Sequence, residues 1–167
     1  MLLCASFSAG RRPSLALAGA CAHFARWTLW QPWKTGHAPL VWVLHLAYFW
    51  IPVHFALRGF AELGWMSPSA AIHALTAGAA GGLIIGMMTR TARSHTGRPL
   101  VADRWDIACY LLVSSAAIVR VAVPPMAPQW TLHAVLCSAA LWSAGFGLYA
   151  VRYWPVLTRD RVDGGPG

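Results

Sequence analysis

The sequence is poor in charged residues for its length. Only 11% of its 167 residues are charged, and five of them are acidic. Soluble domains carry roughly 25% charged residues, so a water-soluble fold of this size could not cover its surface with so few. Hydrophobic residues make up 57% of the chain, and its mean hydropathy is +0.51. These values exclude an ordinary soluble domain and indicate an integral membrane protein.

Lysine and paired cysteine are scarce as well. Lys34 is the only lysine, and arginine supplies the other basic residues of a chain whose net charge is +8. In a soluble protein this excess would suggest nucleic-acid binding, but these arginines lie between apolar segments, so we expect no nucleic-acid partner. The four cysteines form no Cys-x-x-Cys pair, which gives no sign of a disulfide framework or a zinc site.

Apolar segments dominate the rest of the chain, and a membrane helix needs about twenty mostly apolar residues. Four segments are clear, and a fifth, interrupted by His23 and Arg26, precedes them: 13–33, then 39–60, 68–89, 105–123 and 130–152. We therefore predict an all-α, polytopic transmembrane bundle over residues 13–154, with four clear spans and a fifth at the N-terminus. Residues 1–12 are predicted to be an atypical extension, and residues 155–167 a C-terminal tail.

Basic residues are distributed unevenly among the connections. The stretch RTARSHTGRPL, residues 90–100, is predicted to be a loop and carries three arginines. The neighbouring connections, residues 61–67 and 124–129, contain Glu62 and no basic residue. Because basic loops remain in the cytoplasm, we predict that the arginine-rich loop and the C-terminal tail are cytoplasmic.

Tryptophans agree with these boundaries, because an indole ring is most stable at the membrane interface. Seven lie at predicted span ends: Trp27, Trp30, Trp33, Trp65, Trp105, Trp130 and Trp154. Three are deeper and are expected to pack inside the bundle: Trp42, Trp50 and Trp142.

Ionisable residues within the spans are the candidate functional residues, because placing one in a bilayer costs at least a few kcal/mol. They are His45, His54, Arg58, His73, Arg120 and His133. The topology puts all of them toward the outer face except His45, which lies nearer the arginine-rich loop. Histidine ligates haem iron and copper, and arginine pairs with carboxylates such as a haem propionate. The group therefore suggests a haem or metal site. The alternative is that each histidine hydrogen-bonds a neighbouring helix.

Helical spacing separates two faces of the segment that follows His73. At about 100° per residue, one stripe faces away from His73 and suits close helix contact: Gly78, Gly82 and Gly86. The His73 side carries small residues such as Thr76 and Ala77, which leave room for a flat macrocycle or for another helix.

The two histidines of the preceding span are nine residues apart. An ideal helix places His45 and His54 on opposite faces, although a kink at Pro52 could change this. They therefore need not serve one site.

Three segments resemble the NnrS family. HALTAGAAGGLIIGMMTRTARSHTGRPL, residues 73–100, is similar to the family's signature, and WVLHLAYFWIP, residues 42–52, and the tail from Arg152 also resemble it. The family's WHAHE-type motif is absent, and Ser94 stands where glycine is expected. The matching candidate residues are His45, His73, Arg90, His95 and Arg98.

The resemblance implies a polytopic protein of the bacterial inner membrane that contains haem b and copper and takes part in the response to nitric oxide and nitrosative stress. It makes His73 and His45 candidate metal ligands and places Arg90, His95 and Arg98 in a motif loop. Family members have more spans, so this chain is expected to correspond to their C-terminal part and to pack against an upstream membrane chain. Within the bilayer, nitric oxide is the expected ligand.

Two alternatives stay open: a cofactor-free membrane transport module, and a subunit that packs against another membrane protein. Asp103 and Asp106 are expected at the cytoplasmic boundary, which leaves no carboxylate deep in the spans to relay protons. The sequence does not decide whether the protein is an enzyme.

Overall fold

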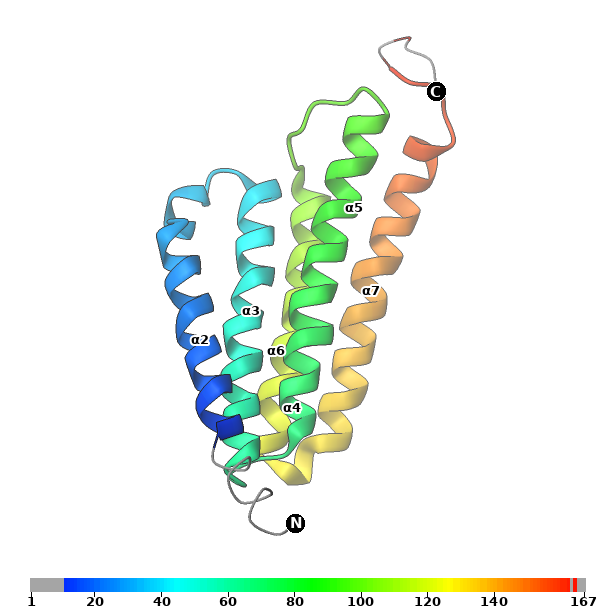
Figure 1. The fold of residues 1–167 in the computed structure, drawn as a ribbon. Helices are drawn as coiled ribbons and strands as arrows, with labels where there is room; N and C mark the ends of the chain where they lie inside the picture. Colours follow the sequence, from blue (N-terminus) through cyan, green and yellow to red (C-terminus); the bar gives the residue numbers. More distant parts are fainter. Residues whose placement is uncertain (1–10, 163, 165–167) are drawn as a thin grey trace, which may run out of the picture.

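The computed structural model describes residues 11–162 and 164, and its helices run side by side in one bundle (Figure 1). The long elements are α2 (Arg11–Leu29), α3 (Pro39–Glu62), α4 (Pro68–His73), the π-helix η2 (Ala74–Ala80), α5 (Gly81–His95), α6 (Arg104–Met126) and α7 (Thr131–Leu157). Two short 3₁₀ helices, η1 (Pro32–Thr35) and η3 (Pro128–Trp130), lie in connections. The described residues include no strand, so the all-α prediction is confirmed.

Four helices of the described chain are long and apolar enough to cross a membrane: Pro39–Glu62, Pro68–His95, Arg104–Met126 and Pro128–Leu157. They confirm the four clear spans, and the second of them is α4, η2 and α5 joined end to end. The predicted fifth span corresponds to α2, which packs along α3 at one side of the bundle (Figure 1). Residues 1–10 of the predicted extension lie outside the described residues, as do 163 and 165–167 of the predicted tail.

The connections gather at two ends of the bundle (Figure 1). The α2–α3 and α5–α6 connections and the end of α7 share one end, while the α3–α4 and α6–α7 connections lie at the other. We call the first the arginine end, because it holds residues 90–104, and the second the histidine end, because it holds His73. At the arginine end the Val162 amide donates a hydrogen bond to the Thr96 carbonyl at 3.2 Å. The tail therefore lies beside the loop that follows α5.

The prediction that residues 90–100 form a loop is wrong for its first half. Helix α5 continues to His95, so Arg90 and His95 are helical and only residues 96–103 connect to α6. Long arginine side chains can reach water from a helix that extends beyond the apolar layer, and they do not end it. Gly97 does so, with φ of 70°, and the Arg98 amide donates to the Arg93 carbonyl at 2.9 Å as in other glycine-terminated helices.

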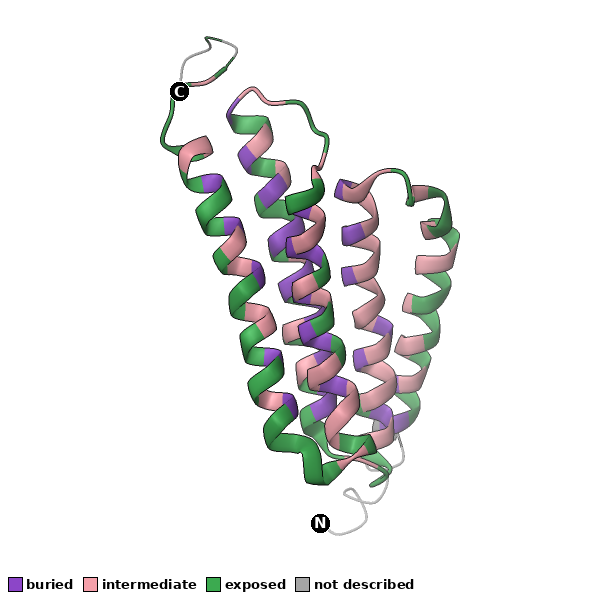
Figure 2. Cartoon of the chain, turned by 180° about the vertical axis from the view of Figure 1, so that it is seen from behind, coloured by how far each residue is buried: buried purple, intermediate pink, exposed green. Residues whose placement is uncertain are grey.

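Glycines join the middle span to α3, as the spacing predicts. A Cβ atom on Gly82 would lie 2.7 Å from the Ala47 Cβ, and Gly78 lies directly against the Trp50 ring. Gly86 approaches the side chains of α3 one turn further on. Buried residues follow the faces that the helices turn toward one another, and the outward faces are exposed (Figure 2). Close backbone contact in the centre and an apolar exterior suit a helix bundle in lipid.

The tryptophans occupy both predicted settings. Trp50 packs on the glycine stripe, Trp142 lies against Gly81, and the Trp42 ring meets the buried Tyr110 ring edge-on at 5.9 Å between centroids. Six of the seven at the predicted span ends are exposed: Trp30, Trp33, Trp65, Trp105, Trp130 and Trp154. The seventh, Trp27, is partly buried and donates its Nε1–H to the His45 carbonyl on α3. The deep tryptophans therefore serve packing, and the exposed ones are available to the membrane interface.

Candidate functional site

A π-helix begins immediately after His73. Residues Ala74–Ala80 form this segment between two α-helical parts of the same span. The Thr76 hydroxyl donates a hydrogen bond to the Ile72 carbonyl at 2.9 Å. Single π-helical segments inside α-helices are uncommon and frequently lie at functional sites. The widened turn is therefore a reason to examine the surroundings of His73.

His73 and Arg120 face the same cleft at the histidine end. Two adjoining hollows, of about 330 and 430 Å³, are both lined by these two residues and by Val135 of α7. Thr76 and Ala77 line the first hollow, as expected for the His73 side of the helix. The guanidinium lies close enough to the imidazole to interact with it electrostatically. The cleft thus combines a nitrogen ligand from one helix with a fixed positive charge from another.

The helices that wall the cleft belong to three spans. His73 belongs to α4, Arg120 to α6 and Val135 to α7, while Ser138 and Trp142 continue the α7 wall. Ser138 donates its hydroxyl to the Ala116 carbonyl at 2.9 Å, so its polar atom is already used. The imidazole and the guanidinium are therefore the chemically active groups of this cleft.

His54 hydrogen-bonds a neighbouring helix, which was the alternative to cofactor binding. It is 9% exposed, and its Nδ1 lies 2.7 Å from the Ala71 carbonyl oxygen of α4. A protonated Nδ1 donates to that carbonyl and joins the two helices. The topology predicts a similar membrane depth for His54 and His73. His54 already hydrogen-bonds the backbone of the neighbouring helix, so its position favours a structural function.

His45 lies on the α2 side of α3, not in the cleft. Its ring is 6.1 Å from the Trp30 ring between centroids, and its carbonyl accepts a hydrogen bond from Trp27 Nε1 at 2.9 Å. The separation of His45 from His54 therefore follows the ideal helical spacing, and Pro52 does not bring the two histidines to one site: α3 remains a single helix through it.

Arg58 and His133 also stand apart from His73. Arg58 is exposed and pairs with Glu62 at 3.6 Å, one helical turn away. His133 is exposed at the start of α7, and its ring lies 5.1 Å from the Trp130 ring between centroids. The depth argument thus placed five ionisable groups at one end of the bundle, and the structure joins His73 with Arg120 in the cleft and His54 with Arg58 on a separate hollow.

Metal-binding side chains do not converge in the described part of the chain. Among residues 11–162 and 164, no three of the histidine, cysteine, aspartate and glutamate side chains are grouped so that they could hold a metal ion. In particular, His73 and His45 belong to different sides of the bundle. Of these two candidate ligands, only His73 lies in the cleft.

Three residues were predicted in the motif loop, and they have different settings. Arg90 is half-buried on α5, and His95 is exposed at the last residue of that helix. Arg98 is the one that lies in the connection, where its Nη1 atom is buried without a hydrogen-bond partner among the described residues.

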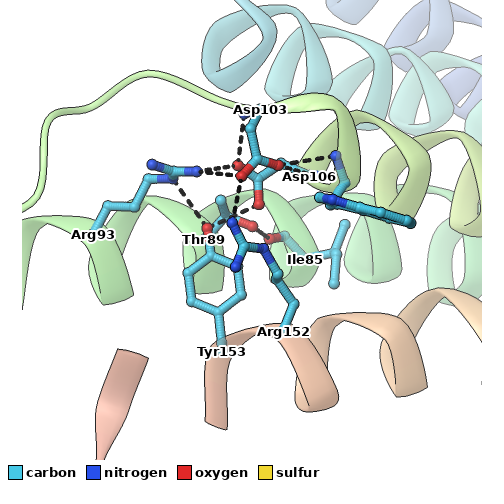
Figure 3. A network of polar contacts seen from close by, with 8 residues as sticks. Ile85, Thr89, Arg93, Asp103, Asp106, Arg152 and Tyr153 are labelled. Atoms are coloured by element: carbon cyan, nitrogen blue, oxygen red, sulfur yellow. Dashed lines mark hydrogen bonds and ion pairs between the residues drawn. The ribbon is translucent and has the colours of Figure 1, made fainter. Parts of the chain in front are cut away.

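A polar network at the arginine end was not predicted from the sequence (Figure 3). Asp106 of α6 is 1% exposed and accepts hydrogen bonds from Arg93 Nη2 at 2.6 Å and from the Tyr153 hydroxyl at 2.8 Å. Arg93 Nε also donates to the Tyr153 hydroxyl at 3.0 Å. The network links α5, α6 and α7, so it fixes the relative positions of three spans.

Asp103 begins α6 and extends this network toward the surface. Its carboxylate accepts the amides of Trp105 and Asp106 at 2.9 and 3.1 Å and Arg152 Nη2 at 3.0 Å. Burial opposes ionisation of this carboxyl, but the backbone hydrogen bond to Asp106, the Arg152 guanidinium and the Trp105 amide outweigh it and lower the pKa of Asp103. In return, the Asp103 amide donates a hydrogen bond to the Asp106 carboxylate at 3.0 Å. The reciprocal pattern is a capping box, and the Asp-x-x-Asp spacing was the signal for it.

Together, the bundle, its four apolar helices and the polar cleft define a polytopic α-helical membrane protein. The chain matches the family described as NnrS protein over residues 1–161, and it belongs to that family. The match confirms the resemblance carried by the motifs and also covers residues 1–12, which those motifs did not reach. No curated protein and no solved structure matches the chain.

Proposed function

We propose that this NnrS-type membrane protein acts in the response to nitric oxide and nitrosative stress, and that it binds haem in the cleft between α4, α6 and α7. The observation that carries the proposal is the pairing of His73 with Arg120 in one cleft. An ionisable group within a membrane span is a functional candidate by default. Here two such groups share a hollow beside a π-helix: His73, which could ligate haem iron, and Arg120, which could pair with a haem propionate.

The two residues would have separate functions toward haem. The His73 imidazole makes no hydrogen bond within the described part of the chain, so a ring nitrogen is available to ligate iron. The planar fork of Arg120 matches a propionate carboxylate. Val135 and Trp142 add apolar surface to the cleft, which limits access of water to the ligand. When bound, the haem iron would supply a position that takes nitric oxide.

Copper does not fit the described residues equally well. Copper sites draw on several converging imidazole or sulfur ligands, and no three histidine, cysteine, aspartate or glutamate side chains are grouped for a metal ion among residues 11–162 and 164. Of the two candidate metal ligands, we therefore propose only His73, as a ligand of haem iron, and we do not propose His45. Any copper in the functional protein would need donors from residues other than those gathered here.

The proposed orientation places the arginine end in the cytoplasm of a bacterial inner membrane and the His73 cleft toward the outside. The segregation of basic residues supports it, because the arginine-rich connection and the end of α7 share one end of the bundle. Cysteines introduced at Ser94 and at Gly64 should react with an impermeant reagent from opposite sides of the membrane. Labelling of both from one side would refute this orientation.

Absorbance spectra of variants test the cofactor proposal. The chain purified from membranes should show a Soret band that is lost in His73→Ala and retained in His95→Ala at equal protein amount. His95 is the matched control, because it lies in the same span but is exposed at the arginine end. Arg120→Gln should keep the band but release haem more readily. A spectrum unchanged by His73→Ala would assign the cleft to helix packing or transport.

A further inference from the structure

A second cavity lies at the arginine end, at the opposite end of the bundle from the His73 cleft. It has a volume of about 290 Å³ and is lined by the loop after α5 and by the last turns of α7. Its charged lining residues are Arg93, Arg98, Asp103, Arg152 and Arg159. The hydrogen bond from the Val162 amide to the Thr96 carbonyl, 3.2 Å long, holds the two walls together.

The charges of this cavity do not balance. Arg93 pairs with Asp106 at 2.6 Å, and Arg152 pairs with Asp103 at 3.0 Å. Each aspartate therefore has its arginine, and Arg98 and Arg159 remain as two positive charges on the same cavity.

Among the described residues that line the cavity, Arg98 has a side-chain donor without a partner. Its Nη1 atom is buried and has no hydrogen-bond partner among the described residues. A buried donor without an acceptor is destabilising, and more so when the group is charged. Arg98 also lines the cavity that Arg159 enters from the other wall, so a negatively charged acceptor bound there would lie beside this guanidinium.

We propose that this cavity binds a phosphate group, carried by an anionic lipid headgroup or by free phosphate. The forked guanidinium donors of Arg98 and Arg159 match phosphate oxygens and form charge-assisted hydrogen bonds to them. The cavity volume of about 290 Å³ is sufficient for a phosphate group, because a single water molecule occupies only about 30 Å³ in the liquid. Trp105 and Trp154 are exposed at the same end of the bundle, 44% and 72% respectively, and exposed tryptophans are typical of the headgroup layer.

Ligand-dependent thermal stability tests this site. The full chain in a non-ionic detergent is heated while its tryptophan fluorescence is recorded, with added inorganic phosphate, phosphatidylglycerol or phosphatidylcholine of matched acyl chains. Arg98→Gln and Arg159→Gln should each need an about tenfold higher concentration of the active ligand for half-maximal stabilisation, because each loses a charge-assisted hydrogen bond. Arg104→Gln is the control, since it removes the same charge at the same end, where Arg104 lies over the Trp105 ring at 5.3 Å.

The ligands distinguish the two sources of phosphate. Stabilisation by phosphatidylglycerol alone assigns the cavity to a lipid headgroup, and stabilisation by inorganic phosphate assigns it to the free anion. The proposal is overturned if neither ligand stabilises the unmodified chain, or if phosphatidylcholine acts as well as phosphatidylglycerol. It is also overturned if Arg104→Gln weakens binding as much as the cavity variants do. Should Arg98→Gln fail to fold, the exposed Arg159 decides the outcome by itself.

Discussion

Asp106→Ala should be the most destabilising single substitution at the arginine end. The carboxylate is 1% exposed and its partner Arg93 is 13% exposed at the side chain, so removal leaves a largely buried guanidinium with only the longer 3.4 Å pair to Asp103, whose carboxylate also binds Arg152. Loss of a neutral hydrogen bond costs about 1 kcal/mol, and interhelical ones in membranes average about 0.6 kcal/mol. An uncompensated buried charge costs about 3–5 kcal/mol. The charge decides the magnitude, and because Asp103 still compensates part of it, we expect a loss of about 2–3 kcal/mol.

The assay is reversible unfolding of the purified chain in mixed detergent micelles, which gives the free energy of unfolding for each variant. Glu62→Ala is the control, because the Arg58–Glu62 pair at 3.6 Å is exposed and such pairs contribute about 0–1 kcal/mol. Replacing Arg93 and Asp106 together by leucine should recover much of the loss, since no charge is then left unpaired. If Asp106→Ala costs no more than Glu62→Ala, the network does not hold the three spans together.

Three further predictions concern packing, a histidine and acid stability. Gly82→Val should lower the free energy of unfolding by about 1–3 kcal/mol, because its Cβ would lie 2.7 Å from an α3 side chain, whereas Gly147→Val, with nothing within 4 Å, should be tolerated in the same assay. His54→Ala should cost about 1 kcal/mol by loss of its 2.7 Å bond to α4, and its Soret band should equal that of the unmodified chain. Asp103 has a lowered pKa when folded, so its contribution is present above its unfolded pKa and is lost as the pH falls through the folded value. A pH titration of stability below the ordinary aspartate pKa of 3.8 should therefore show a shallower decline for Asp103→Asn.

Much of the fold follows from segment length and spacing. Four apolar stretches of membrane-crossing length become four spanning helices, and the spacing of Gly78, Gly82 and Gly86 predicts the face that meets α3. The positions of helix ends were harder to predict. Arginine marks the edge of the apolar layer, but the helix ends only where Gly97 adopts positive φ. Charge alone therefore did not predict where this helix ends.

The sequence predicted how far along its span each site residue lies, but not which neighbouring helix its side chain faces. Counting residues along each span placed His54, His73 and Arg120 toward one end, and they lie there. Which of these side chains meet depends on which helices are neighbours in the bundle. The hydrophobic periodicity of a single sequence does not determine that. The π-helix after His73 depends on a shift of backbone hydrogen bonds from i−4 to i−5, which no residue type in ALTAGAA specifies.

The Arg93–Asp106 pair shows a different limit. Arg93 was placed in the arginine-rich loop and Asp106 at the cytoplasmic boundary, but no contact between them and no capping box was predicted, although an Asp-x-x-Asp spacing can signal one. Tyr153, the third member, lies 47 residues beyond Asp106 and reaches it only because α7 returns to the arginine end. Contacts of this kind require the topology first.

The haem content of the purified chain tests the central proposal most directly. Haem extracted from a known amount of protein should amount to about one per chain, as expected for one histidine ligand in one cleft. That content should fall close to zero in His73→Ala and stay unchanged in His54→Ala, whose side chain bonds the Ala71 carbonyl instead. An unmodified chain that contains no haem, or equal haem in all three proteins, would contradict the assignment of His73 as the ligand.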